Sequence, residues 1–83
     1  MRRRRRYNYR EIAHDLAHRI ILGEHRPGTQ IPSYTELSDL YEVSYRTAAR
    51  AVAVVRDEWG MVYGEQGRGV FVEDRRYWRY PHA

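Results

Sequence analysis

The chain contains no cysteine and no lysine, and the first absence excludes whole classes of structure. Without cysteine there is neither a disulfide framework nor a thiolate metal site. No apolar run approaches the length of a membrane span, and the N-terminus carries arginines instead of a secretory hydrophobic segment. A chain of 83 residues is long enough for one domain with a modest core, but not for a core plus a deep substrate cleft. We therefore expect one soluble, cytoplasmic domain that uses no cofactor.

The positive charge is concentrated at one end of the chain. The net charge is +4, but the first ten residues alone carry +6, so the remainder sums to −2. We divide the chain into a basic arm (1–7), a folded domain (8–73) and an aromatic-basic tail (74–83). Nucleic-acid binding by the folded part must therefore depend on where its own arginines lie, not on its total charge.

Capping signals predict the first two helices. Asn8 with Glu11, and Ser33 with Glu36, each have the spacing of a capping box. The first helix is expected to end at Gly23, and a turn follows at 26–29. Apolar spacing predicts a buried face on both helices. This face consists of Tyr9, Ile12, Ala13, Leu16 and Ile20 in the first helix, with Asp15 and Arg19 pointing the other way, and of Leu37, Leu40 and Tyr41 in the second.

A third helix and a hairpin complete the pattern. Ser44 can cap a helix that runs to about Trp59, with Gly60 as its left-handed stop. Two short strands (61–63 and 70–72) flank a glycine-rich tip (64–69). Few residues separate the second and third helices, which is typical of a helix-turn-helix. The predicted fold class is mainly α with a small β-hairpin: a winged helix-turn-helix of three helices plus a wing.

The third helix has two unlike faces. Thr47, Ala48, Ala51, Val54 and Val55 fall on the side expected to pack, whereas Arg46 and Arg50 lie among alanines on the other. Small side chains allow the backbone to approach DNA, and arginine can make paired hydrogen bonds to guanine in the major groove. We expect both arginines to read bases, and Arg50→Ala to weaken binding to a cognate site far more than to random DNA. The alternative is a solvated outer face with scattered arginines.

Three further segments are candidate DNA contacts. The amides and hydroxyls at the start of the second helix can hold a phosphate, although plain capping is the alternative there. The glycine-rich tip can approach a minor groove or a phosphate, although an ordinary hairpin turn is the alternative. The arm should contact phosphates, unless it is only a solubilising or membrane-surface tail. The candidate DNA-binding residues are Arg46, Arg50, Tyr45, Thr47, Ser44, Ser33, Tyr34, Thr35, Gln66, Gly67, Arg68, Gly69, Arg2, Arg3, Arg4, Arg5 and Arg6.

The remaining features of the sequence do not indicate a metal site or a catalytic site. His14 and His18 are one helical turn apart, as in some zinc sites, but no third ligand is convincingly placed. We expect solvent-facing histidines, no metal site and no enzyme activity, since no set of nucleophile, base and orienting group has the required pattern. The tail holds three arginines among aromatic residues. It could pack on the domain, mediate dimerisation or contact nucleic acid, and its sequence does not choose between these.

The chain from Tyr9 to Val72 resembles the DNA-binding domain of the GntR family of bacterial transcription regulators. The ordered set that carries the resemblance is Tyr9, Ile12, Leu16, Ile20, Gly23, Pro27-Gly28, Ile31-Pro32-Ser33, Leu37, Tyr41, Val43-Ser44, Thr47, Ala51, Gly60 and Gly67-Arg68-Gly69-Val70-Phe71-Val72. The resemblance implies a winged helix that binds double-stranded DNA, a homodimer on a near-palindromic operator, and usually repression.

Two departures from the family pattern limit what it implies. The family usually has arginine where this chain has Thr35, Tyr45 and Ala49, so an operator preference cannot be transferred. Family members also usually carry a C-terminal effector domain, whereas eleven residues follow Val72 here. We expect no small-molecule effector from this chain alone, whether it acts by itself or belongs to a longer regulator. The alternative functions are a winged-helix adaptor that binds an acidic protein and an RNA binder that uses the arm.

Overall fold

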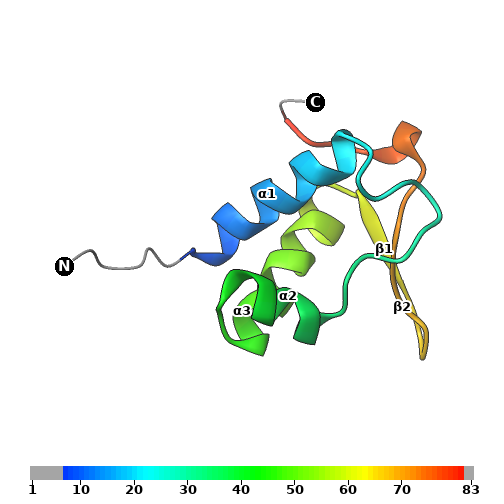
Figure 1. Cartoon of the computed structure of the whole chain (residues 1–83). Helices are drawn as coiled ribbons and strands as arrows, with labels where there is room; N and C mark the ends of the chain where they lie inside the picture. Colours follow the sequence, from blue (N-terminus) through cyan, green and yellow to red (C-terminus); the bar gives the residue numbers. More distant parts are fainter. Residues whose placement is uncertain (1–6, 82–83) are drawn as a thin grey trace.

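The computed structural model describes residues 7–81, so the predicted contacts of Arg2–Arg6 lie outside the described residues. Three helices precede a two-stranded antiparallel hairpin, which confirms the predicted winged helix-turn-helix (Figure 1). Within residues 7–81, none of the helices combines the length and the apolar character that crossing a bilayer requires. The elements are α1 (Tyr9–Ile21), α2 (Tyr34–Tyr41), α3 (Tyr45–Ala53), the π-helical turn η1 (Val54–Glu58), β1 (Val62–Glu65), β2 (Gly69–Val72) and the 3-10 turn η2 (Arg75–Tyr77).

Side-chain caps fix the helix starts, as the sequence predicts. The Asn8 side chain accepts a hydrogen bond from the Glu11 amide (2.8 Å), and the Glu11 carboxylate accepts one from the Asn8 amide (3.0 Å). Ser33 and Glu36 exchange the same two bonds at 3.0 and 2.7 Å. Each box satisfies two amides that have no partner within the helix, and this fixes where α1 and α2 begin.

The third helix is not regular along its whole predicted length. It changes at Val54 into a π-helical turn, in which the Trp59 amide bonds to the Val54 carbonyl (3.3 Å). The wider turn accompanies burial of the Trp59 ring in the core. Gly60, at φ +61°, then reverses the chain as predicted.

The core lies between the three helices, with α3 packed against both α1 and α2, and β1 and β2 close it from the side. Leu40 was predicted to belong to it, but its side chain is 62% exposed; Leu37 and Tyr41 supply the buried face of α2. The largest fully buried side chains are Ile12, Leu16, Ile20, Leu37, Met61, Val52, Val55 and Val72.

Asp15 does not point away from the fold, contrary to the sequence prediction. Its carboxylate accepts hydrogen bonds from the Tyr41 hydroxyl of α2 and from Arg19 Nε (2.9 Å). Burial alone would raise the pKa of the Asp15 carboxyl, but the bonds from Tyr41 and Arg19 and the Arg19 charge outweigh it and hold that pKa below its ordinary value. This polar bridge fixes α2 against α1.

The wing (62–72) is held by a third extended segment. Its strands pair from Val62 with Val72 to Glu65 with Gly69. The segment before α2 adds backbone bonds along β2: the Gly28 amide donates to the Val72 carbonyl (2.8 Å), and the Ile31 amide to the Val70 carbonyl (2.9 Å). The wing is thereby positioned against the start of α2.

The segment after β2 packs on the helices, one of the alternatives that the sequence leaves open. Tyr80 is buried against Trp59, with ring centroids 4.7 Å apart. Its hydroxyl lies 2.6 Å from His14 Nδ1 and 3.2 Å from His18 Nε2. The prediction of solvent-facing histidines is therefore wrong for His14, which is half-buried under a ring contributed from 66 residues later.

Candidate nucleic-acid interface

The N-terminal half of α3 presents the predicted polar face. Ser44 caps the helix by accepting a hydrogen bond from the Thr47 amide (3.0 Å), and its hydroxyl also donates to the Thr47 hydroxyl (3.0 Å). Ala48 and Ala51 are buried beneath this turn. Arg46 is exposed, and it forms neither a hydrogen bond nor an ion pair within residues 7–81. Its guanidinium therefore keeps its full charge and all its N–H donors for a ligand.

Two tyrosines join α3 to the start of α2. The Tyr45 ring is 58% exposed and packs edge-on against Tyr34, with centroids 5.5 Å apart. Thr35 is exposed beside Tyr34 on the first turn of α2, whose N-cap is Ser33. The predicted contacts on α2 and α3 thus form one continuous surface.

The wing tip (66–68) is exposed. Gly67 adopts a positive φ of +77°, and the Arg68 side chain is 71% exposed. Within residues 7–81, the Arg68 side chain forms one long ion pair, with Glu65 (3.4 Å), and lies 5.7 Å from the Phe71 ring. An arginine so weakly held remains available to a phosphate or a minor groove.

Gln30 braces this tip, and the sequence analysis missed it. Its side-chain amide donates to the Arg68 carbonyl (2.9 Å), across 38 residues of sequence. Gly69, at φ +122°, leaves room for that amide, since a Cβ there would overlap Gln30 Nε2. No local pattern marks Gln30, because its partner becomes a neighbour only when the hairpin folds back.

An open groove of about 410 Å³ separates the wing from the two helix starts. It brings together three predicted segments: the start of α2, Tyr45 of α3 and the wing tip. In Figure 1 the wing tip and the start of α3 lie at the lower end of the molecule, and the C-terminal segment lies at the top. The groove is lined by Gln30, Ile31, Pro32, Ser33, Tyr34, Thr35, Tyr45, Gly64, Glu65, Gln66, Gly67, Gly69 and Val70.

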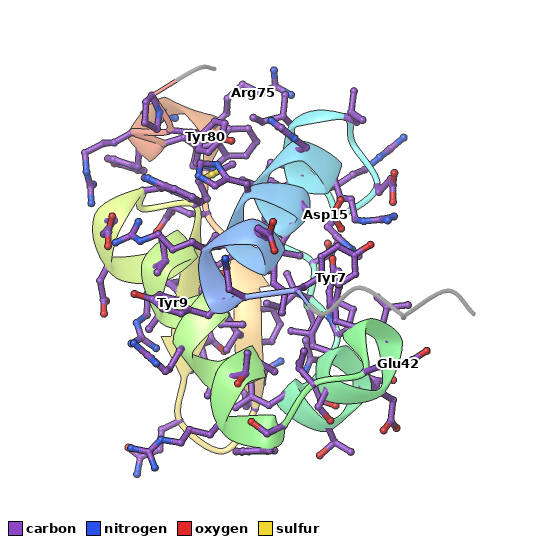
Figure 2. The ribbon with its side chains drawn as sticks, turned by 90° about the vertical axis from the view of Figure 1, so that its left-hand side faces the viewer. Tyr7, Tyr9, Asp15, Glu42, Arg75 and Tyr80 are labelled. Atoms are coloured by element: carbon purple, nitrogen blue, oxygen red, sulfur yellow. The ribbon has the colours of Figure 1, made fainter. Side chains whose placement is uncertain are left out.

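Arg50 does not extend freely beside Arg46. Its guanidinium carbon lies 4.0 Å from the centroid of the Tyr9 ring, which belongs to the first residue of α1. Figure 2 shows Tyr9 at the start of α1, on the side of α3, whereas Tyr7 and Asp15 lie on the side of α2. The two arginines share a helix face, but Arg50 is drawn back toward α1.

A family model for bacterial regulatory proteins of the gntR family matches residues 8–72, which is most of the chain and includes the whole surface just described. The chain belongs to the GntR family. The match confirms the resemblance identified from the sequence.

Comparisons with individual proteins support the same family assignment. The chain is 36% identical over 69 residues to YieP of Escherichia coli (strain K12), described as an uncharacterized HTH-type transcriptional regulator. A GntR family transcriptional regulator from Listeria monocytogenes superposes with a TM-score of 0.76 at 30% identity, over 83% of this chain and 60% of that one. The AraR DNA-binding domain in complex with operator ORR3 superposes with a TM-score of 0.72 at 30% identity, over 77% and 76% of the two chains.

This GntR-family chain is short beside some relatives. It spans 30% of the length of YieP and 60% of the Listeria chain, whereas it covers three quarters of the AraR domain. The similarity therefore concerns the winged helix, which is the part that the AraR structure shows on DNA.

Proposed function

We propose that this chain binds double-stranded DNA with sequence specificity and regulates transcription, most simply as a repressor. The observation that carries the proposal is the exposed guanidinium of Arg46 on the first turn of α3, which has no hydrogen bond or ion pair within residues 7–81. Its neighbour Tyr45 lines the groove between the wing and the start of α2. The comparison with AraR supports it, because that related domain is solved on its operators.

Arg46 is the proposed base-reading residue. The small side chains of Ala49 and Ala53 on the same outer face let the helix backbone approach the floor of a major groove. A guanidinium there can pair with O6 and N7 of guanine. Because Arg46 has no bond to break within the described chain, its hydrogen bonds to a base cost it no internal partner.

The surrounding residues are proposed to position the duplex. Tyr34 and Thr35 belong to the first turn of a capped helix, where amides and the helix dipole favour a phosphate. Tyr45, beside Tyr34, extends that contact to α3. Ser44 and Thr47, which bond to each other, contribute by fixing the first turn of α3. The wing segment 66–69 is proposed to meet the minor groove or the backbone on the other side of the groove.

The proposal also includes the basic arm and the binding of two copies of the chain to one operator. Arg2–Arg6 add phosphate contacts that raise affinity and salt dependence without reading sequence. Two copies bind the half-sites of a near-palindromic operator, as the two-fold symmetry of such sites requires. We propose that the chain works in the cytoplasm without enzyme activity, and that this chain alone binds no small-molecule effector.

The test is a titration of two duplexes, one selected from a random pool and one of random sequence. Arg46→Ala should weaken binding to the selected duplex by about 1–3 kcal/mol, and binding to the random duplex much less. Arg26→Ala is a matched control, because Arg26 is exposed in the turn after α1, away from the groove. Equal losses on both duplexes would refute base reading by Arg46. No binding of the wild type to either duplex at low salt would instead favour a protein-interaction adaptor.

A further inference from the structure

The contact between Arg50 and Tyr9 joins two elements that begin far apart in the sequence. Arg50 lies in the middle of α3 and remains exposed, yet its guanidinium covers the ring of Tyr9 at 4.0 Å. An arginine on a helix surface ordinarily samples several rotamers. Stacking on a half-buried ring selects one of them and fixes the guanidinium at the edge of α3 that faces α1.

The carboxylates around Arg50 are occupied by other arginines. Arg50 and Tyr9 border a shallow hollow that Asp57 and Glu58 also line. Asp57 accepts two bonds from Arg56 (2.8 and 3.1 Å), and Glu58 accepts two from Arg10 (3.2 and 2.7 Å). Arg50 thus meets an aromatic face and has no hydrogen bond or ion pair within residues 7–81.

A stacked guanidinium with no carboxylate partner has its face covered and its edges available. Cation–π contact occupies the plane of the group, whereas hydrogen bonds leave from its rim. Arg50 therefore keeps its charge and donors while its direction is set. That direction leads away from Arg46 and toward the start of α1, which Tyr7 and Asn8 connect to the Arg2–Arg6 block.

We propose that Tyr9 is a positioning residue that holds Arg50 at the border of the recognition surface, where Arg50 binds a backbone phosphate and not a base. This inference rests on the proposed DNA-binding function and revises the base-reading role that the sequence suggested for Arg50. The reading surface then has two parts: Arg46 enters the groove, and the Tyr9–Arg50 pair holds the strand beside it.

The phosphate role has a measurable signature. Each phosphate contact contributes about 0.9 to the slope of log affinity against log salt. Arg50→Ala should lower that slope by about 0.9 and weaken selected and random duplexes by the same factor. A loss confined to the selected duplex would show base reading and overturn the proposal.

The positioning role is tested in a double-mutant cycle. Tyr9→Leu should weaken both duplexes about two- to five-fold, the range of an exposed cation–π contact, while Tyr9→Phe keeps the ring and the affinity. In the Arg50→Ala background, Tyr9→Leu should have no further effect. Tyr7→Leu is the matched control, since the Tyr7 ring packs edge-on against Tyr41 (5.8 Å) on the α2 side.

The outcomes distinguish a failure of this inference from a failure of the proposed DNA-binding function. If Tyr9→Leu causes the same loss with or without Arg50, the ring does not act through Arg50 and the positioning role is wrong. If the wild type binds duplexes and Tyr9→Leu binds as well as wild type, this inference alone fails. If the wild type binds no duplex, the proposed DNA-binding function fails with it.

Discussion

The two ends of the molecule differ in the partners of their charged and polar side chains. At the tail end, formed by the second half of α1, the end of η1 and the segment 73–81, polar groups bond to one another. The Tyr80 hydroxyl lies between His14 and His18, and the Arg79 amide donates to the Trp59 carbonyl (2.7 Å). At the reading end, formed by the starts of α2 and α3 and the wing tip, Arg46 has no such partner within residues 7–81.

This difference separates stability from recognition. Bonds within the chain at the tail end hold the helices together, and a ligand would have to break them. At the reading end, the guanidinium of Arg46 gains hydrogen bonds only when something else supplies the acceptors. Changes at one end should therefore alter unfolding, and changes at the other should alter binding.

The largest effect is expected from Tyr80→Ala. The substitution removes a buried ring from its packing on Trp59, and such changes cost roughly 3 kcal/mol of unfolding free energy. Urea denaturation measures the loss. DNA affinity under conditions where the variant stays folded should match wild type. A stable variant, or one that fails to bind DNA while folded, would break the separation between the two ends.

Tyr80→Phe sharpens the same comparison. Burial raises the pKa of the Tyr80 hydroxyl above its ordinary value, so this hydroxyl stays protonated near neutral pH. The phenylalanine keeps the ring and deletes the hydroxyl, with its contacts to His14 and His18. The expected loss is about 1 kcal/mol. A loss as large as that of Tyr80→Ala would mean that the hydroxyl network, and not the ring, holds the tail.

Gly69→Ala tests the brace under the wing and is expected to rank second, after Tyr80→Ala. The residue would be strained at φ +122° and would push Gln30 off the Arg68 carbonyl, at a cost of about 1–3 kcal/mol. Gly67→Ala is the control, because it has positive φ but open space around it. Thermal unfolding should rank Gly69→Ala as the more harmful, and Gln30→Ala should relieve part of its effect. Equal losses of stability in Gly69→Ala and Gly67→Ala would show that the displacement of Gln30 contributes nothing.

The sequence predicted what local signals encode. The boxes at Asn8 and Ser33 and the stop at Gly60 involve residues a few positions apart, and all three are confirmed. It did not predict contacts that depend on how elements meet. Tyr80 on His14 and Arg50 on Tyr9 join residues that become neighbours only after the helices pack. For the same reason the sequence predicted which segments form the candidate site, but it did not predict that Arg50 turns toward Tyr9.

Arg68→Ala should affect binding without affecting folding. Arg68 is exposed and its single ion pair is long, so unfolding should change by less than about 0.5 kcal/mol. If the wing contacts a phosphate, the salt slope of DNA binding should fall by about 0.9. An unchanged slope would exclude Arg68 from the phosphate contacts. A clear loss of stability would show that the Arg68 side chain helps to hold the fold together.

A small effect that depends on pH is expected at Asp15. Its pKa is lowered in the folded state, so its contribution to stability is present above the ordinary value of 3.8 and is lost as pH falls through the lower folded-state value. Asp15→Asn should therefore be less stable than wild type at pH 7, by at most about 1 kcal/mol for so exposed a pair. Denaturation at pH 7 and pH 3 should show the gap closing. A gap that stays constant would mean that charge has no part in the α1–α2 bridge.

The division into a reading end and a tail end is tested most directly by following backbone amides in an NMR titration with a duplex selected from a random pool. The account predicts shifts concentrated at 33–35, 45–50 and 66–69, with 75–80 nearly unchanged. Shifts centred on 75–80 and the exposed face of α1, with 45–50 unmoved, would contradict it.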